Sequence, residues 1–269
     1  TTIAPCPTMV QGQEKSRADE MPVRIRPLKR LIRRRTRWLN RRRDTLRLSI
    51  IVPTLNEAVE LPRLLKSMAP VMERGAETIV VDGGSSDESV AIAECFGCIV
   101  LRSPRGRAPQ MNAGAALATG NALLFLHADT RLPERAEDLV ADALGRGRFA
   151  WGRFDVRIGG PGFTLRLVSW MMNWRSRMTG IATGDQAIFV TREAFAEVGG
   201  FPDQPLMEDI ELSKRLRTVS PPACIKERVI TSARRWQARG VWRTILLMWR
   251  LRFDYWRGVP PSVLVEAYR

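Results

Sequence analysis

Acidic side chains recur directly after predicted strands, where an α/β enzyme keeps its chemistry. Asp82 ends one predicted strand, Asp129 follows another by three residues, and Glu208 and Asp209 precede a helical stretch. Ligands of open α/β sheets bind at the carboxyl ends of the strands. An Asp at such an end can bind Mg²⁺ or Mn²⁺, which take their other ligands from phosphates and water. His127 would point the same way as Asp129, because side chains alternate along an extended chain.

Each of these acids also has an ordinary structural explanation. Asp82 can cap the turn after its strand, and Asp129 can cap the helix that begins near Pro133. Glu208 and Asp209 can simply favour a helix N-terminus, by at most about 1 kcal/mol. Position alone therefore leaves metal binding and capping open for each acid.

The elements that must position these residues follow from the hydrophobic pattern. From Leu48 onward, short apolar runs alternate with helical stretches, which indicates a mainly parallel sheet covered by helices. The runs predicted to be strands in this first half cover residues 48–52, 77–82, 98–101 and 122–126. A strictly alternating run at residues 153–158 predicts a further strand that is wet on one face. The predicted fold class is α/β with a mixed, mainly parallel central sheet flanked by helices.

Two later stretches predict amphipathic helices. In the first, Phe163–Met178, one face carries the large apolar residues and the other carries Arg166, Ser169, Asn173 and Ser176. The second, at about residues 238–257, has aromatic and aliphatic residues at helical spacing from Trp242 to Trp256 and an arginine every seven residues. Such a helix suits a membrane interface, or it packs on the domain while its arginines extend into solvent.

Positive charge is concentrated at the start of the chain. The net charge is +15, and residues 1–47 hold 14 Lys and Arg against 4 Asp and Glu. Like-charge repulsion opposes compact folding there, so we expect a disordered basic arm followed by one domain at residues 48–269. An anionic membrane surface is a better partner for this arm than nucleic acid, because nothing downstream resembles a groove-reading element.

Cysteine usage and hydropathy bear on the compartment. Four scattered cysteines are too few for a disulfide framework, and the lone CxxC pair at Cys95 and Cys98 has no second pair for a zinc site. No apolar stretch resembles a secretory signal or a spanning helix. We therefore expect a cytoplasmic protein, peripheral on the inner face of the cell membrane if it contacts lipid at all.

Six short motifs occur in an order that resembles family 2 glycosyltransferases. They are Ser49–Glu57, Val80–Asp87, Leu126–Asp129, Gly199–Phe201, Glu208–Asp209 and Arg235–Trp236. The resemblance runs from about Leu48 to about Tyr255. The stretches Arg107–Gly114, Thr183–Gln186 and Pro205–Asp209 are similar to a bacterial subgroup of small enzymes, some of which are labelled carotenoid-acid glycosyltransferases.

The resemblance implies a GT-A fold, a nucleoside-diphosphate sugar donor, a divalent metal (Mn²⁺ or Mg²⁺) and inversion at the anomeric carbon. The residues that would line the nucleoside site are Pro53, Asn56, Glu57 and Asp82. Asp129 matches the last acid of the family's metal-binding DxD, and His127 occupies the place of the first. An imidazole is compatible with Mn²⁺ and less natural for Mg²⁺.

The same resemblance implies the catalytic groups. Asp209 would be the general base, with Glu208 orienting it or taking that role. Arg107 opens a predicted helix at the carboxyl edge of the sheet and suits phosphate. Further candidates for substrate binding are Asp185, Gln186, Arg235 and Trp236. The last two match the end of a QxxRW motif that has Ser232 in the place of Gln.

The function predicted is an inverting glycosyl transfer, with a hexose favoured, to an acceptor hydroxyl or carboxyl on a lipid-like molecule. A sugar-nucleotidyltransferase is one alternative, but it needs a glycine-rich basic loop where this chain has Pro53–Glu57. A catalytically inactive membrane-binding or nucleic-acid-binding protein dominated by the arm is the other. Donor hydrolysis by a chain lacking residues 1–47 separates an enzyme from a pure binder.

Overall fold

The computed structural model describes residues 46–268, except for the side chain of Arg235. The basic arm predicted for residues 1–47 falls almost wholly outside this range. The described residues form one eight-stranded sheet with helices on both faces.

Four parallel strands form the first half of the sheet, as the apolar runs predict. They are β1 Leu48–Thr54, β2 Glu77–Asp82, β3 Ile99–Arg102 and β4 Ala122–Phe125. Their order is β3-β2-β1-β4, so their carboxyl ends meet at one edge. Every residue of β4 is buried, which explains its uniformly apolar sequence.

The second half makes the sheet mixed, and its strand order is β7-β6-β8-β5. These strands are β5 Thr130–Arg131, β6 Trp151–Ile158, β7 Ile188–Thr191 and β8 Ala223–Thr231. β7 runs antiparallel to both β4 and β6, whereas β8 runs parallel to β6. The alternating run predicts β6, but the hydrophobic pattern did not identify β5, β7 or β8.

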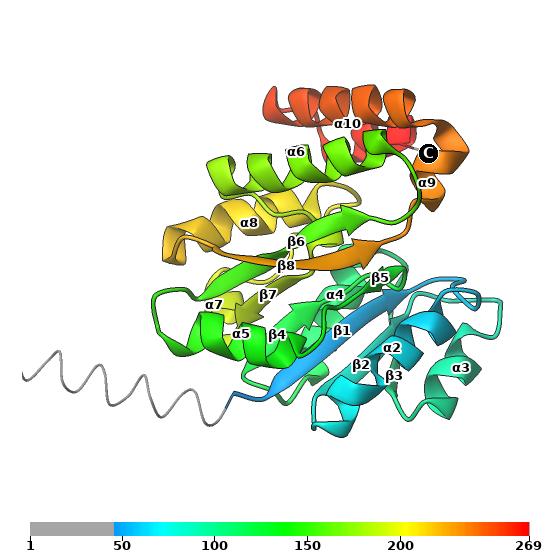
Figure 1. Cartoon of the computed structure of the whole chain (residues 1–269), viewed down its shortest axis with the longest axis vertical. Helices are drawn as coiled ribbons and strands as arrows, with labels where there is room; N and C mark the ends of the chain where they lie inside the picture. The colour runs from blue at the N-terminus through cyan, green and yellow to red at the C-terminus, as the bar shows by residue number, and fades with distance from the viewer. Residues whose placement is uncertain (1–45, 269) are drawn as a thin grey trace, which may run out of the picture.

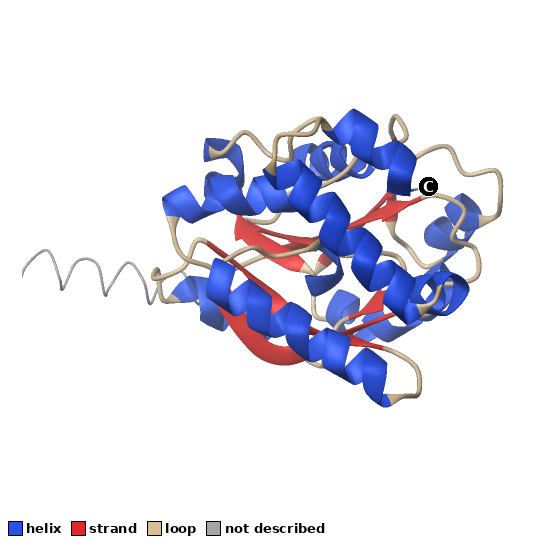
Figure 2. Cartoon of the chain, turned by 90° about the horizontal axis from the view of Figure 1, so that it is seen from above, coloured by secondary structure: helices blue, strands red, loops and turns tan. Residues whose placement is uncertain are grey.

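Helices cover both faces of the sheet and bury separate apolar clusters. The helices are α2 Leu61–Glu73, α3 Ser89–Cys95, α4 Arg107–Leu117, α5 Ala136–Gly145, α6 Phe163–Thr179, α7 Arg192–Glu197, α8 Glu208–Val219, α9 Arg234–Arg239, α10 Val241–Trp256 and α11 Pro261–Tyr268. α2 and α5 pack on one face, and α4, α7 and α8 pack on the other. α6 and α10 lie together beyond the edge of β6 (Figures 1 and 2).

Helix α4 lies unusually close to the parallel strands because residue 114 is glycine. A Cβ atom at Gly114 would lie 2.5 Å from Ile51 Cγ2 and 2.9 Å from Val81 Cγ2. The close packing fixes the direction of the helix, whose first residue is Arg107. The structure thus confirms that this arginine opens a helix at the carboxyl edge.

Helix α6 turns its polar face inward. Ser169 Oγ accepts a hydrogen bond from Ile158 N at 2.9 Å, and Asn173 pairs with both backbone groups of Val156, at 2.8 and 2.9 Å. These contacts provide hydrogen-bond partners for the backbone groups of β6 that extend past its partner strand β7. The apolar face points outward as a consequence, and Trp170 is 61% exposed and Trp174 55%.

Helix α10 also keeps large apolar side chains outside the core. Trp242 is 69% exposed and Trp256 is 78% exposed. The helix begins after Gly240, whose φ of +80° separates it from α9. The predicted amphipathic stretch at about 238–257 is therefore the end of α9 followed by α10. Within residues 46–268, every helix is too short or too polar to cross a bilayer.

Candidate active site

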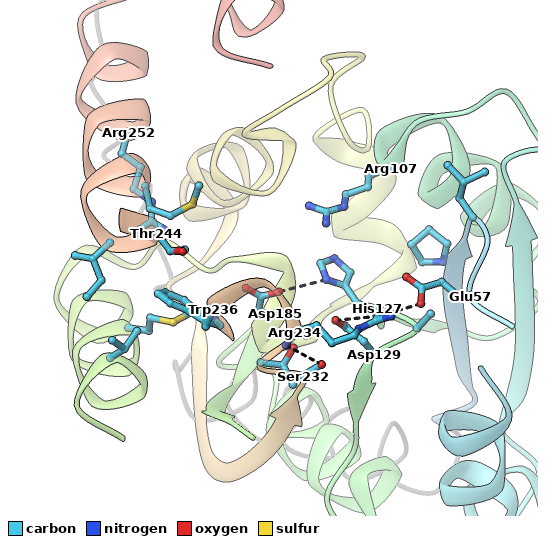
Figure 3. Close-up of a pocket in the computed structure, with 18 of the residues that line it drawn as sticks. Glu57, Arg107, His127, Asp129, Asp185, Ser232, Arg234, Trp236, Thr244 and Arg252 are labelled. Carbon is cyan, nitrogen blue, oxygen red and sulfur yellow. Dashed lines mark hydrogen bonds and ion pairs between the residues drawn. The ribbon is translucent and has the colours of Figure 1, made fainter. Parts of the chain in front are cut away.

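A cavity of about 740 Å³ opens at the carboxyl edge of the sheet. One wall comes from the loops after β1 and β4 and from the start of α4, and the opposite wall comes from α6 and α10 (Figure 3). Of the site residues predicted from the sequence, the cavity lining includes Pro53, Glu57, Arg107, His127, Asp129, Asp185 and Trp236. Residues as far apart in sequence as Pro53 and Arg252 thus surround one space.

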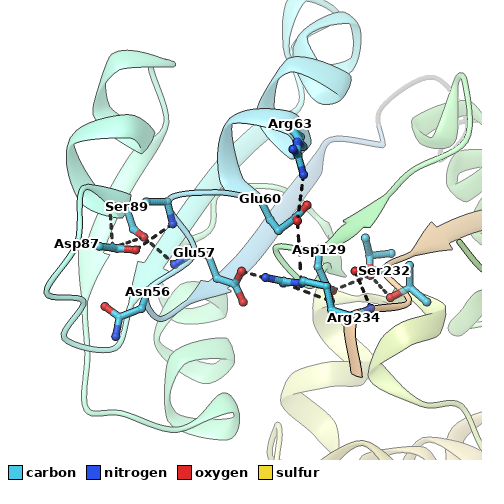
Figure 4. A network of polar contacts seen from close by, with 12 residues as sticks. Asn56, Glu57, Glu60, Arg63, Asp87, Ser89, Asp129, Ser232 and Arg234 are labelled. Carbon is cyan, nitrogen blue, oxygen red and sulfur yellow. Dashed lines mark hydrogen bonds and ion pairs between the residues drawn. The ribbon is translucent and has the colours of Figure 1, made fainter. Parts of the chain in front are cut away.

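Asp129 does not cap a helix. One of its carboxylate oxygens lies 3.6 Å from a terminal nitrogen of Arg234, which also lies 3.0 Å from Glu57 Oε2. Glu60 lies 4.0 Å from the same guanidinium, so three carboxylates surround it (Figure 4). The N-cap of α5 is Arg135 instead. This edge of the cavity is therefore an acidic cluster held by one arginine.

Arg234 is a site residue that sequence reasoning missed. The family motif directs attention to the next residue, Arg235, whose side chain lies outside the described part of the chain. Ser232, which replaces the motif's Gln, accepts a hydrogen bond from Arg234 N at 3.1 Å and donates its own N–H to Asp129 O at 3.1 Å. The pair of adjacent arginines before Trp236 was the available signal.

Two residues that the sequence predicts in the nucleoside site form hydrogen bonds within the loops of this structure. The Asp82 carboxylate is 2% exposed and accepts the N–H groups of Gly84 and Ser85 at 3.0 to 3.1 Å, which is the turn-capping explanation. Asn56 has a φ of +54° and accepts Ser86 N at 2.8 Å. Neither lines the cavity, so their contact with a nucleoside stays a prediction.

His127 is held between two groups of the segment after α6. Its Nδ1 lies 3.4 Å from Asp185 Oδ1. A Cβ atom at Gly184 would come within 2.5 Å of the imidazole ring, so only glycine lets this segment approach. Gln186, in contrast, is fully buried and bonds within the fold, with its Oε1 accepting Thr183 N at 3.2 Å. A substrate contact of Gln186 is not visible in this arrangement.

The predicted metal ligands meet the requirement for a cation only in part. The described residues contain no group of three or more His, Cys, Asp and Glu side chains that could hold a metal ion. Asp129 lines the cavity with a side chain that is 28% exposed, and a Mg²⁺ or Mn²⁺ that arrives with a diphosphate needs only one or two protein ligands. Asp129 therefore fits a cation carried by a nucleotide, whereas His127 Nδ1 faces Asp185.

Glu208 and Asp209 begin α8 in a small hollow beside the cavity, where His127 and Gly184 also lie. Asp209 Oδ2 accepts Gly184 N at 2.8 Å. Glu208 is 4% exposed, and burial raises its pKa to about 7, with the Asp209 carboxylate acting in the same direction. Arg107 Nη1 is 4.0 Å from Glu208 Oε1 and opposes this shift. Near neutral pH, Glu208 is therefore protonated in a large fraction of molecules.

The opposite wall is apolar with two basic groups. It is formed by Val168, Met171, Met172, Trp174, Ile245, Met248 and Trp249, together with Arg175 and Arg252. The sequence alone assigned no role to either of these two arginines. Their shared location becomes visible only when α6 and α10 are folded side by side.

A doubly wound first half, an antiparallel strand beside β4 and a cavity at the carboxyl edge are the arrangement of the GT-A fold. The Glycosyl transferase family 2 model matches residues 49–197, more than half of the chain. The chain belongs to that family.

Relatives of this chain carry the same description. An uncharacterized glycosyltransferase of Mycobacterium tuberculosis is 31% identical over 191 residues, which cover 66% of this chain and 71% of the relative. A PGL/p-HBAD biosynthesis glycosyltransferase of the same species is 44% identical over 105 residues. That match covers 36% of this chain and only 39% of the relative. The relatives are bacterial, and the carotenoid-acid subgroup stays a prediction.

Solved structures agree in fold. Staphylococcus aureus TarS residues 1–349 matches with a TM-score of 0.57 and 17% identity, covering 70% of this chain and 61% of that one. Glucosyl-3-phosphoglycerate synthase of Mycobacterium tuberculosis matches with a TM-score of 0.51 and 18% identity over 71% of each chain. TarS has been solved with UDP-GlcNAc, and the synthase with Mn²⁺, UDP and phosphoglyceric acid.

Proposed function

We propose that this protein moves a hexose, with inversion, from a nucleoside diphosphate to an acceptor bound between α6 and α10. The observation that carries the proposal is the continuity of the cavity. Its polar wall at β1 and β4 suits a nucleotide sugar, and its apolar wall suits a lipid-like acceptor. The solved neighbours that bind UDP or a UDP-sugar support the choice of donor.

On the donor side, the proposal rests on charge. Arg107 lines the cavity at the first turn of α4, where a guanidinium and the helix N-terminus both favour phosphate. Asp129 would bind a Mn²⁺ or Mg²⁺ ion that accompanies the diphosphate, with His127 as a further ligand once Asp185 releases it. When bound, such an ion neutralises charge on the leaving diphosphate.

The reaction proposed is a single displacement. A carboxylate takes the proton of the acceptor hydroxyl, the hydroxyl oxygen attacks the anomeric carbon, and the bond from that carbon to the diphosphate breaks with its electron pair on the diphosphate. An acceptor carboxylate would attack in the same way without losing a proton. Attack opposite the leaving group inverts the anomeric configuration.

Two carboxylates meet the requirement for a base. The family resemblance assigns the role to Asp209, which adjoins the cavity and is fixed by Gly184 N. Asp185 is the alternative because it lines the cavity itself and is 36% exposed. A general base contributes about 10²- to 10⁴-fold to the rate. Glu208, buried and partly protonated, would orient these groups.

The test uses the full chain with Mn²⁺ and a panel of UDP- and GDP-linked hexoses. We expect saturable donor binding and slow donor hydrolysis. Asp209→Asn or Asp185→Asn, whichever removes the base, should keep donor affinity and lower the kcat of donor hydrolysis by 10²-fold or more. A variant that keeps the wild-type kcat shows that the residue it replaces is not the base. The proposal fails if no donor binds, or if both variants hydrolyse donor as the wild type does.

We also propose that the protein works on the cytoplasmic face of the membrane as a peripheral enzyme. The exposed apolar faces of α6 and α10 are next to the cavity mouth, and arginines such as Arg166 and Arg243 are exposed on the same helices. Amphipathic helices of this composition lie in anionic interfaces. Binding to phosphatidylglycerol vesicles but not to phosphatidylcholine vesicles would support this; equal or absent binding would contradict it.

A further inference from the structure

The apolar wall of the cavity contains two arginines that have no carboxylate partner in the described part of the chain. Arg175 extends from α6 and Arg252 from α10, and both line the cavity. Neither forms an ion pair within 4.0 Å with any carboxylate among residues 46–268. The surrounding lining is apolar, with Met171, Met248 and Trp249 among its members. Basic groups in such a position need an explanation, because an unpaired charge away from water is costly.

Arg175 carries the strongest sign of an absent partner. Its Nε and Nη2 atoms are buried and make no hydrogen bond with any described residue. Burial, together with repulsion from Arg252, lowers the pKa of Arg175 to about 9. Burial also lowers the pKa of Arg252. Asp209 acts in the opposite direction on both groups but is not in contact with either.

A contrasting arginine lies close by on β6. Arg153 is fully buried, donates its Nε–H to Ser176 Oγ at 3.0 Å, donates to Asn173 O at 3.2 Å and is ion-paired with Asp155. The fold therefore satisfies a buried guanidinium where it serves only structure. Arg175 is not satisfied in this way, although Ser176 follows it directly in the chain.

We propose that Arg175 and Arg252 form a subsite for the anionic group of an amphiphilic acceptor. The ligand is an oxyanion, either a carboxylate or a phosphate, attached to an apolar body that lies along the methionines and tryptophans of α6 and α10. Two guanidinium groups bind an oxyanion through several charge-assisted hydrogen bonds. This subsite rests on the proposed function, since it defines the acceptor of that same reaction.

The subsite has its own binding test, which requires no sugar donor. Trp174 and Trp249 line the cavity, so their fluorescence reports occupancy. The full chain is titrated with dodecyl phosphate, dodecanoate and the uncharged dodecanol, each below the concentration at which it forms micelles. We expect at least one anionic probe to bind about tenfold or more tightly than dodecanol. The stronger of the two anions identifies the headgroup as phosphate or carboxylate.

Single variants test whether the two arginines cause the preference for anionic probes over dodecanol. Arg175→Gln and Arg252→Gln should each reduce the preference for the anion to about twofold or less, and the two variants on separate helices guard against a folding failure of one. Lys66→Gln on α2 and Arg146→Gln after α5 remove exposed basic side chains away from α6 and α10 and should keep the preference. Equal binding of charged and neutral probes by the wild type, or a preference retained in both cavity variants, overturns the subsite.

A separate measurement distinguishes acceptor from donor. Affinity for UDP with Mn²⁺ should stay within about twofold in Arg175→Gln and Arg252→Gln. A loss of tenfold or more would show that the arginines bind the diphosphate and would overturn the acceptor assignment. If the wild type binds no nucleotide but still prefers the anionic probe, the proposed function fails while the subsite stands.

Discussion

The two halves of the sheet treat large apolar side chains in opposite ways. In residues 46–150 they are enclosed by helices on both faces, and the exceptions are few and scattered, such as Val59 and Phe96. In residues 151–268 five tryptophans are more than half exposed, all on α6 and α10. Enclosure suits the proposed binding of a polar nucleotide sugar at the loops of the first half. Exposure suits the proposed entry of an apolar acceptor at the second half.

The halves also differ in how their polar groups are used. In the first half, loop residues such as Asn56, Asp82 and Asp87 hold turns at the carboxyl edge. In the second half, Ser169 and Asn173 turn inward to complete β6. A helix that uses its polar face on the sheet has only its apolar face left for the outside. The apolar wall of the cavity is therefore a consequence of how α6 completes the hydrogen bonds of β6.

After their proposed roles, residues 46–150 are called the donor half and residues 151–268 the acceptor half. The largest effect is expected from Asp129→Asn in the donor half. Loss of this carboxylate removes a negative group from the acidic cluster and the oxygen offered to a cation, so kcat/KM for donor turnover should fall about 10³-fold. Steady-state kinetics with the best donor measures the loss. Asp203→Asn, an exposed acid away from the cavity, should have no effect. Activity within tenfold of the wild type would show that the donor wall does not depend on Asp129.

The second prediction concerns Glu208, the first residue of α8, which lies in the small hollow together with His127. Its folded pKa of about 7 lies above the ordinary value of 4.5, so the folded protein holds an extra proton between these values. The contribution of Glu208 to wild-type stability should therefore fall as pH rises through this window. Glu208→Gln should remove that fall, and it should match the wild type at pH 4.5 and exceed it at pH 8.

Urea unfolding across this pH range measures the effect of Glu208→Gln. Glu193→Gln, which replaces an exposed acid on α7, serves as the control and should leave the pH dependence unchanged. Parallel curves for the wild type and Glu208→Gln would mean that the buried carboxyl titrates normally.

The third prediction tests the tight packing of the donor half. Gly114→Ala forces a Cβ atom against Ile51 and Val81, so the free energy of unfolding should fall by about 2 kcal/mol. Ala116→Ser on the exposed side of α4 should change it by less than about 0.5 kcal/mol. Chemical denaturation measures both. If Gly114→Ala costs nothing, α4 is free to shift and does not fix the position of Arg107.

The smallest effect is expected from the exposed face of the acceptor half. A double variant, Trp170→Ser with Trp242→Ser, should weaken binding to phosphatidylglycerol vesicles about tenfold without lowering stability. Val59→Ser, which removes an exposed apolar side chain from the donor half, should leave vesicle binding unchanged. Co-sedimentation gives the affinities. Equal losses in both halves would remove the distinction between them.

Sequence alone predicted the first half well because parallel strands buried on both faces are written as continuous apolar runs. The bounds predicted for β2 agree with the structure, and those for β1, β3 and β4 differ by one or two residues. β7 and β8 were missed. β8 combines exposed residues such as Lys226 and Glu227 with a register shift opposite Phe154, so it shows no clean alternation.

The sequence predicted the site residues that belong to motifs. It did not predict those that come together only through tertiary packing. Asp129, His127 and Arg107 line the cavity as their positions after strands and at a helix start suggest. Arg175 and Arg252 meet only through the packing of two helices, which no spacing encodes. Periodicity likewise identified the apolar face of α6, but it could not tell that this face points outward, because the direction depends on unpaired groups of β6.

Arg234 gives the acidic edge a further property. Its guanidinium contacts the carboxylates of Glu57, Glu60 and Asp129, and these contacts are partly exposed, so each of them is weak and readily released. In the proposed reaction, a cation that arrives with a nucleotide would take over the position that the Arg234 guanidinium holds beside Asp129, and the released arginine would be available to the phosphates. The same carboxylates would then serve two cations in turn, the arginine of the free protein and the metal ion of the nucleotide complex.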